Sequence, residues 1–207
     1  MSGFNSKSLF IKEDSQKIYC HYLEPTAVQK LSSRFTHLLL TINPGLIRPV
    51  VVVGIGTDRC TGDCLGPLVG TKLSEMGDVK PIVYGTLDDP IHANNLKKKI
   101  EHIKNKHFKP LIVAVDASLG RTSSIGKITL APGSLKPGAG VNKELPEVGD
   151  IHFTGIINVG GFMEYFVLQN TRLSLVMKMA QKISLSIYYG YKKALSCQGD
   201  SQRDLLP

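Results

Sequence analysis

The sequence predicts a three-layer α/β/α domain built on a mostly parallel, twisted sheet. Two continuous apolar runs, residues 50–55 and 111–115, have the composition of strands buried on both faces, which is typical of parallel sheets. Amphipathic helical segments alternate with such strands along the chain, and this alternation favours helices on both faces of one sheet.

The other elements follow from the same periodicities. We expect helices over residues 28–35, 65–76 and 94–107, and from about 162 onward with a break near Asn170. Residues 36–42 form a short apolar run, and further strands are expected at 82–84, 127–130 and 151–158. The 207 residues suit a single α/β domain over 1–207, with polar, mobile ends at 1–15 and 196–207.

Composition and charge exclude several classes of protein. The formal net charge is +8, but the densest lysine run, residues 97–99, has no interleaved aromatic residues and reads as the solvated face of a helix. We therefore expect no nucleic-acid partner. No apolar stretch has the length of a signal peptide or a membrane span, and the four cysteines are too dispersed for a disulfide framework. These features predict a cytoplasmic protein with reduced thiols and no membrane partner; a homo-oligomer stays open.

The glycine-rich loop at residues 54–67 does not fit a nucleotide-binding motif. A dinucleotide fingerprint that begins at Gly54 needs glycine at its sixth position, which is Arg59, and the Gly-Lys-Ser/Thr of a P-loop is absent. Asp58 and Asp63 would also repel an anion in this loop. We expect no nucleotide and no other cofactor.

Two aspartates follow the predicted buried strands. Asp63 stands in the loop after the first, and Asp116 directly follows the second. Taken singly, Asp63 is explained as a helix N-cap and Asp116 as a turn residue. The carboxyl ends of parallel strands meet at one edge of a sheet, so the two side chains are expected to lie together, where they can share a proton or hold a metal.

Several motifs resemble those of a known family. Gly54-x-Gly56, residues 61–67, the strand ending in Asp116-Ala117 and residues 136–143 look like the spore germination protease and, more distantly, hydrogenase maturation proteases. Nearly the whole chain resembles the sporulation protein YyaC family of endospore formers, which shares this fold. The resemblance implies that Asp63 and Asp116 are catalytic. It also implies a cytoplasmic setting, in the sporulating cell or the forespore.

The resemblance also bears on metal and substrate. In hydrogenase maturation proteases a histidine of a later loop helps to hold nickel, but this chain has Lys136 at the corresponding position, and a lysine repels a cation. We therefore predict no metal. The expected substrate-binding residues come from the loops around the aspartates, and a lysine there would lower a neighbouring aspartate pKa. They are Gly56, Thr57, Asp58, Lys136, Gly138, Gly140, Asn142 and Lys143.

Three functions remain open at this point. The first is a sporulation- or germination-associated peptidase that cleaves a protein or peptide with the carboxylate pair. The second is a catalytically silent protein that binds a protein or peptide partner through the same cleft. The third is a metal-dependent maturase. An open cleft favours hydrolysis, whereas a cleft filled by the C-terminal helix favours the binding role.

Overall fold

The protein, described here by a computed structural model, is built on one six-stranded sheet with the strand order β1-β5-β6-β4-β2-β3. The structure describes residues 17–138 and 145–203, with side chains as far as residue 198. The predicted mobile segment 1–15 and the last four residues lie outside this part. The strands are β1 (Ile18–His21), β2 (Val50–Gly54), β3 (Ile82–Tyr84), β4 (Leu111–Gly120), β5 (Lys127–Pro132) and β6 (Ile151–Val159).

The sheet is parallel in its larger part. β6, β4, β2 and β3 run in the same direction. On the β6 side, β5 pairs antiparallel with β6, and β1 pairs antiparallel with β5. The predicted mostly parallel sheet is confirmed. β1 was not predicted from the sequence; its four residues form a strand through their pairing with β5.

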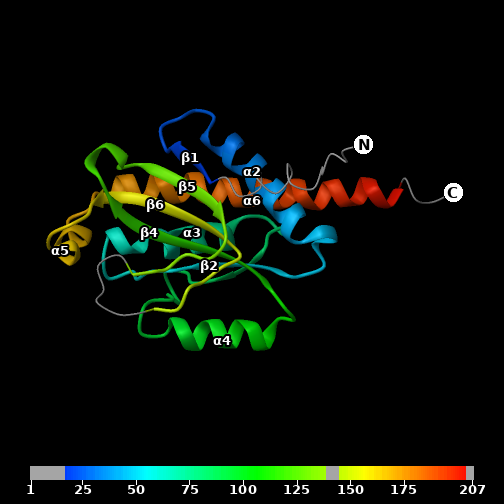
Figure 1. The fold of residues 1–207 in the computed structure, drawn as a ribbon, viewed down its shortest axis with the longest axis horizontal. Coiled ribbons are helices and arrows are strands. Elements are labelled where there is room, and N and C mark those ends of the chain that lie inside the picture. Colours follow the sequence, from blue (N-terminus) through cyan, green and yellow to red (C-terminus); the bar gives the residue numbers. More distant parts are fainter. Residues whose placement is uncertain (1–16, 139–144, 204–207) are drawn as a thin grey trace, which may run out of the picture.

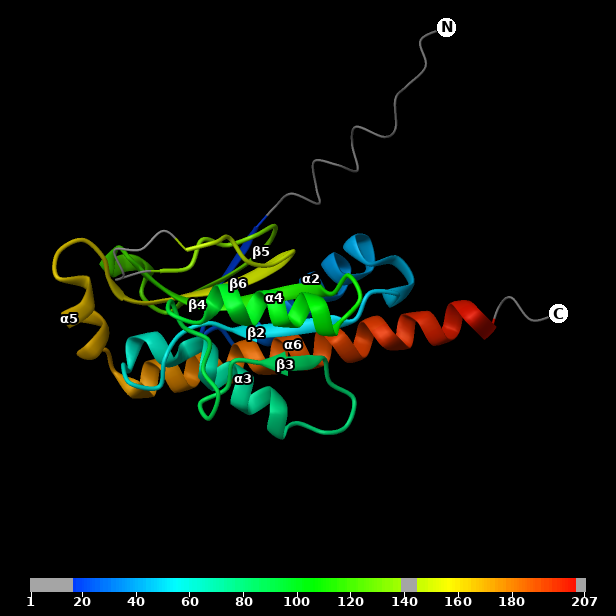
Figure 2. The ribbon, with the colours of Figure 1, turned by 90° about the horizontal axis from the view of Figure 1, so that it is seen from below.

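Helices cover both faces and make the predicted three layers (Figures 1 and 2). α2, α3 and α6 cover one face with the larger apolar core, and α4 covers the other with a smaller core over β2 and β4. The helices are α2 (Ala27–Ile42), α3 (Leu65–Glu75), α4 (Leu96–Lys106), α5 (Glu164–Gln169) and α6 (Leu173–Arg203), with 3-10 turns η1 (Pro44–Leu46), η2 (Gly62–Cys64) and η3 (Thr122–Ser124). Within residues 17–138 and 145–203, no helix has the length and apolar character needed to cross a membrane.

Three predicted boundaries were wrong. Residues 28–42 form one helix, because the buried hydroxyl of Thr36 is satisfied by bonds to the carbonyls of Ser32 (2.9 Å) and Gly190 (3.0 Å). β4 does not end at Asp116, since pairing with β6 carries it on to Gly120. α6 continues past residue 196 to Arg203.

Glycines bring α3 into direct backbone contact with the sheet. A Cβ on Gly66, in the first turn of α3, would overlap the backbone of Ile55 and approach the carbonyl oxygen of Val115 to 2.7 Å. A Cβ on Gly54, at the end of β2, would overlap the carbonyl of Gly66 in turn. The loop between β2 and α3, which carries Asp63, is therefore fixed at both ends against the centre of the sheet.

Candidate active site

A pocket of about 270 Å³ opens at the carboxyl ends of the parallel strands. β4 contributes Asp116, the segments that follow β2, β3 and β6 contribute most of the other lining residues, and the connection between β5 and β6 closes one side. This is the edge at which open parallel sheets bind ligands. The lining residues are Ile55, Gly56, Thr57, Asp58, Arg59, Cys60, Asp63, Pro90, His92, Ala93, Asn94, Asp116, Pro137, Gly138, Leu145, Tyr165 and Leu168. None of them belongs to α6, so the C-terminal helix does not fill this cleft.

Asp63 enters the pocket from η2, the turn before α3. Its side chain is half-buried and makes no capping bond, because Cys64 occupies the N-cap position of α3 and the helix has no side-chain cap. The N-cap explanation of Asp63 is therefore wrong. Gly56, at a φ of +139°, lets the preceding loop fold against Asp63, whose backbone carbonyl accepts a bond from the Thr57 N–H at 3.1 Å.

Asp116 comes from the middle of β4. Its neighbour on β6 is Thr154, whereas β2 has already ended beside Val115, so the carboxyl group stands where the sheet narrows. Only 6% of the residue is exposed, and one carboxyl oxygen accepts the N–H of Ala117 at 2.8 Å. A buried position inside a strand does not fit the turn explanation of Asp116.

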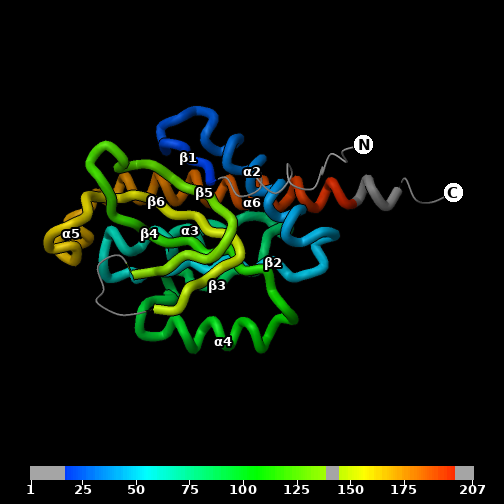
Figure 3. Tube along the Cα trace, in the orientation of Figure 1, coloured from blue at the N-terminus to red at the C-terminus, as the bar shows by residue number. Residues whose placement is uncertain are grey.

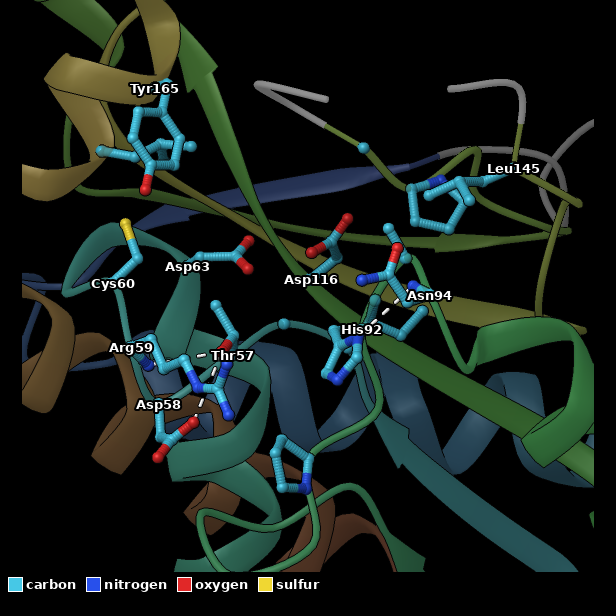
Figure 4. A pocket seen from close by; sticks show the side chains of 17 residues that line it. Thr57, Asp58, Arg59, Cys60, Asp63, His92, Asn94, Asp116, Leu145 and Tyr165 are labelled. Carbon is cyan, nitrogen blue, oxygen red and sulfur yellow. Dashed lines mark hydrogen bonds between the residues drawn. The ribbon is translucent and has the colours of Figure 1, made fainter. Parts of the chain in front are cut away.

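The two carboxyl groups point toward one another across the pocket (Figure 4). Burial raises the pKa of Asp63 to about 6, and the Thr57 N–H offsets this only in part. The pKa of Asp116 is raised well above its usual value, chiefly by burial and then by the charge of Asp63, against smaller lowering effects of the Ala117 and Gly138 N–H groups. The more deeply buried Asp116 therefore favours the protonated form, beside an Asp63 that ionises more readily.

The other predicted site residues divide into three groups. Gly56, Thr57, Asp58 and Gly138 line the pocket as expected. Lys136 is exposed and is not part of the lining. Gly140, Asn142 and Lys143 lie outside the described residues. The predicted lowering of an aspartate pKa by Lys136 is wrong, because both carboxyl pKa values are raised and Lys136 is not among the groups that shift them.

Sequence reasoning missed two walls of the pocket. Residues 90–94, between β3 and α4, supply Pro90, His92, Ala93 and Asn94, and α5 supplies Tyr165 and Leu168. Both segments follow parallel strands, so the rule that led to Asp63 and Asp116 would have found them had it been applied to β3 and β6 as well. Arg59 and Cys60 lie in the loop that the sequence had already singled out.

The side chains do not fit a metal site of the kind that the resemblance to hydrogenase maturation proteases implies. Throughout the described residues, no three His, Cys, Asp or Glu side chains gather closely enough to hold a metal ion. His92 lines the pocket, but its Nδ1 already accepts the Asn94 N–H at 3.3 Å. Catalytic zinc sites use three protein ligands, and the described residues supply no such group, so no step of the chemistry is assigned to a metal.

Of the two cysteines in the loop between β2 and α3, Cys60 lines the pocket and Cys64 does not. Cys60 and Cys64 are both buried and unpaired as disulfides. Burial raises the pKa of Cys64 to about 11, and its thiol donates to the Thr61 carbonyl at 3.0 Å. A thiol that keeps its proton is a poor nucleophile, so Cys64 is a structural thiol.

Together the fold and the pocket define an α/β protein with one buried and one half-buried carboxyl group at the carboxyl edge of a parallel sheet. The chain belongs to the family described as "Protein of unknown function (DUF1256)", which matches residues 19–186. It is 52% identical over 176 residues to the "Uncharacterized protein YyaC" of Bacillus subtilis (strain 168), a match that covers 85% of this chain and 84% of that protein. The predicted membership of the YyaC family is confirmed.

A solved structure also resembles this one. It is the crystal structure of the [NiFe] hydrogenase maturation protease HycI from Thermococcus kodakarensis KOD1, with 22% sequence identity and a TM-score of 0.46. The match covers 69% of this chain and 92% of that one.

Proposed function

We propose that the protein is a peptidase in which Asp63 and Asp116 act together on a peptide bond. The observation that supports this most directly is the pairing of two carboxyl groups with different proton affinities in one open pocket. A general base and a general acid are both needed to hydrolyse an amide near neutral pH. Where the surroundings give two neighbouring carboxyl groups different pKa values, the group with the lower pKa serves as the base and the group with the higher pKa serves as the acid.

In this mechanism the ionised Asp63 accepts a proton from a water molecule, whose oxygen attacks the peptide carbonyl carbon. The protonated Asp116 donates its proton to the carbonyl oxygen as the tetrahedral intermediate forms. Collapse of the intermediate breaks the C–N bond, and the proton held by Asp63 passes to the departing nitrogen as it leaves as an amine. As the carboxyl product forms, one of the two hydroxyl groups of the intermediate returns a proton to Asp116, so both carboxyl groups regain their starting states. No cofactor takes part in these steps.

The backbone around the carboxyl pair leaves room for an extended substrate. Gly56 and Gly138 both line the pocket, at φ values of +139° and +120°, and neither carries a side chain that would hold a substrate chain away. Thr57, Asp58 and Asn94 add polar groups at the rim, which suit the N–H and C=O groups of a peptide.

For the biological setting, we propose a protein or peptide substrate in the cytoplasm of a sporulating cell or forespore. The 52% identity to a Bacillus subtilis protein supports this placement. The formal charge of +8 favours an acidic substrate, because opposite charge raises the rate of encounter.

The proposal is tested by incubating the purified full-length chain with a spore-protein extract and identifying new peptide N-termini by mass spectrometry. Asp63→Asn and Asp116→Asn are each expected to slow cleavage at least about 100-fold, the scale of a lost acid or base. Asp78→Asn, an exposed aspartate after α3, is the matched control and should cleave at the wild-type rate. Equal cleavage by all four proteins would refute the roles of the pair. Binding of a peptide without cleavage by the wild type would instead assign the protein to the silent binding class.

A further inference from the structure

Large apolar side chains gather on the surface around α5. Phe162, Met163, Tyr165 and Phe166 are 86%, 59%, 64% and 57% exposed, although they are consecutive or nearly so in the sequence. We call these four residues the α5 apolar surface. Figure 3 shows that β6 leads directly into this part of the chain, at the end of the molecule opposite the C-terminus of α6. A soluble protein rarely exposes so much clustered apolar surface without a binding partner.

The helix beneath this surface is held firmly. Leu168 is buried, and it packs so closely on Gly62 that a Cβ there would lie 2.8 Å from the leucine side chain. The side-chain amide of Asn158 donates to the Val167 carbonyl and to the Thr171 hydroxyl, both at 3.2 Å. A surface fixed in this way loses little conformational entropy when it binds a ligand.

The α5 apolar surface is continuous with the pocket. Tyr165 and Leu168 line the pocket, and the ring of Tyr165 lies at the same end as Cys60 and Asp63 (Figure 4). The surface thus begins at Tyr165, beside one carboxyl group, and includes the exposed rings of Phe162 and Phe166. The one charged side chain of α5, Glu164, accepts the Gly161 N–H at 3.2 Å.

We propose that the α5 apolar surface binds large apolar side chains of an extended polypeptide whose peptide bond lies at Asp63 and Asp116. This inference rests on the proposed peptidase function and names its substrate class: unfolded or extended segments with aromatic or large aliphatic residues on one side of the cleaved bond. The continuity of the surface with the pocket selects this occupant, because a chain held at the carboxyl pair must leave the pocket across one of its walls. Every second side chain of an extended strand then faces the same wall of the pocket.

The test uses two fluorescein-labelled 14-residue peptides. One carries Phe and Leu at alternate positions of an otherwise Ser, Gly and Glu sequence, and the other has Ser at those positions. Binding is followed by fluorescence anisotropy on the Asp116→Asn protein, so that cleavage does not disturb the measurement. Phe162→Ser and Phe166→Ser are introduced together. Phe108→Ser is the matched control, since Phe108 is 82% exposed but lies just before β4, at the opposite edge of the sheet.

The apolar peptide should bind roughly tenfold more weakly to the Phe162→Ser/Phe166→Ser protein than to the Phe108→Ser protein. The serine peptide should bind weakly to both. Equal affinity of the apolar peptide for the two variants would overturn the proposal. A concentration-dependent dimer in sedimentation velocity, abolished by the double substitution, would also overturn it and assign the surface to a second copy of the chain. Absence of cleavage by the wild type would remove the peptidase function alone, because the binding result is read without turnover.

Discussion

Replacing Asp63 by Asn should make the protein more stable above pH 6 and leave its stability almost unchanged at pH 4. The pKa of Asp63 rises from its ordinary value of 3.8 to about 6 on folding, because burial disfavours the charged form. Below pH 3.8 the carboxyl group is protonated in both the folded and the unfolded chain. Between the two pKa values only the folded chain keeps the proton, so the free energy of unfolding falls as the pH rises.

The size of the effect follows from the same two pKa values. The loss is complete above about pH 6 and amounts to about 3 kcal/mol, which is an upper limit because the side chain is only half-buried. Asn carries no charge at any of these pH values and avoids the loss. For a chain of this length the gain corresponds to roughly 6–12 °C in the melting temperature at pH 8.

Urea unfolding followed by circular dichroism at pH 4, 5, 6, 7 and 8 measures the difference. Asp58→Asn is the control, since Asp58 lies in the same loop but is exposed, and it should follow the wild type within about 0.5 kcal/mol. The reasoning is refuted if the difference between Asp63→Asn and wild type is the same at pH 4 and pH 8. A destabilised Asp63→Asn at pH 8 would show that the charge is held by a partner rather than desolvated.

Further changes should have separable effects. Gly66→Ala should cost about 3 kcal/mol or more, because its Cβ meets backbone that cannot move, while Gly77→Ala, which meets only the Tyr188 hydroxyl at 3.4 Å, should change stability by less than about 1 kcal/mol in the same urea assay. Peptidase kcat/KM should rise as the pH passes about 6, where Asp63 loses its proton, and should fall at higher pH; a pH-independent profile from 4 to 9 would contradict the shared-proton mechanism. Arg48→Ala should cost about 1–2 kcal/mol, since its guanidinium donates to the carbonyls of Lys109 and Pro110, both at 2.9 Å; unchanged thermal unfolding would disprove that role.

The strands that carry the site could be predicted because their sequences are apolar on both faces. The first predicted run, residues 50–55, is β2 with one added residue, and the second is the first half of β4. The second half of β4 could not be predicted, because residues 116–120 have no apolar pattern and are strand only through their pairing with β6. The buried Thr36 hid the continuity of α2 for a similar reason, since its hydroxyl partner on Gly190 is distant in the sequence.

The sequence predicted where the candidate site lies better than it predicted which residues line it. Asp63 and Asp116 were found from the strand that precedes each of them, and both line one pocket. Lys136 was expected from its position in a motif, yet it faces solvent, because Leu135 and Pro137 on either side of it are buried and turn it outward. Tyr165 carries no local signal of its own, since only the folding of α5 onto η2 brings it to the pocket.

The pocket draws each of its walls from a different strand connection, and this has a consequence for how its selectivity can vary. The carboxyl pair belongs to the rigid interior, where α3 meets the sheet backbone to backbone, whereas the residues facing an incoming chain come from 90–94 and from α5. Substitutions in either of those segments would leave the hydrogen-bonded ladder of the sheet intact. In the proposed peptidase, preference for one substrate over another would thus be separable from the chemistry, and exchanging a short surface segment would direct the same scaffold to new substrates.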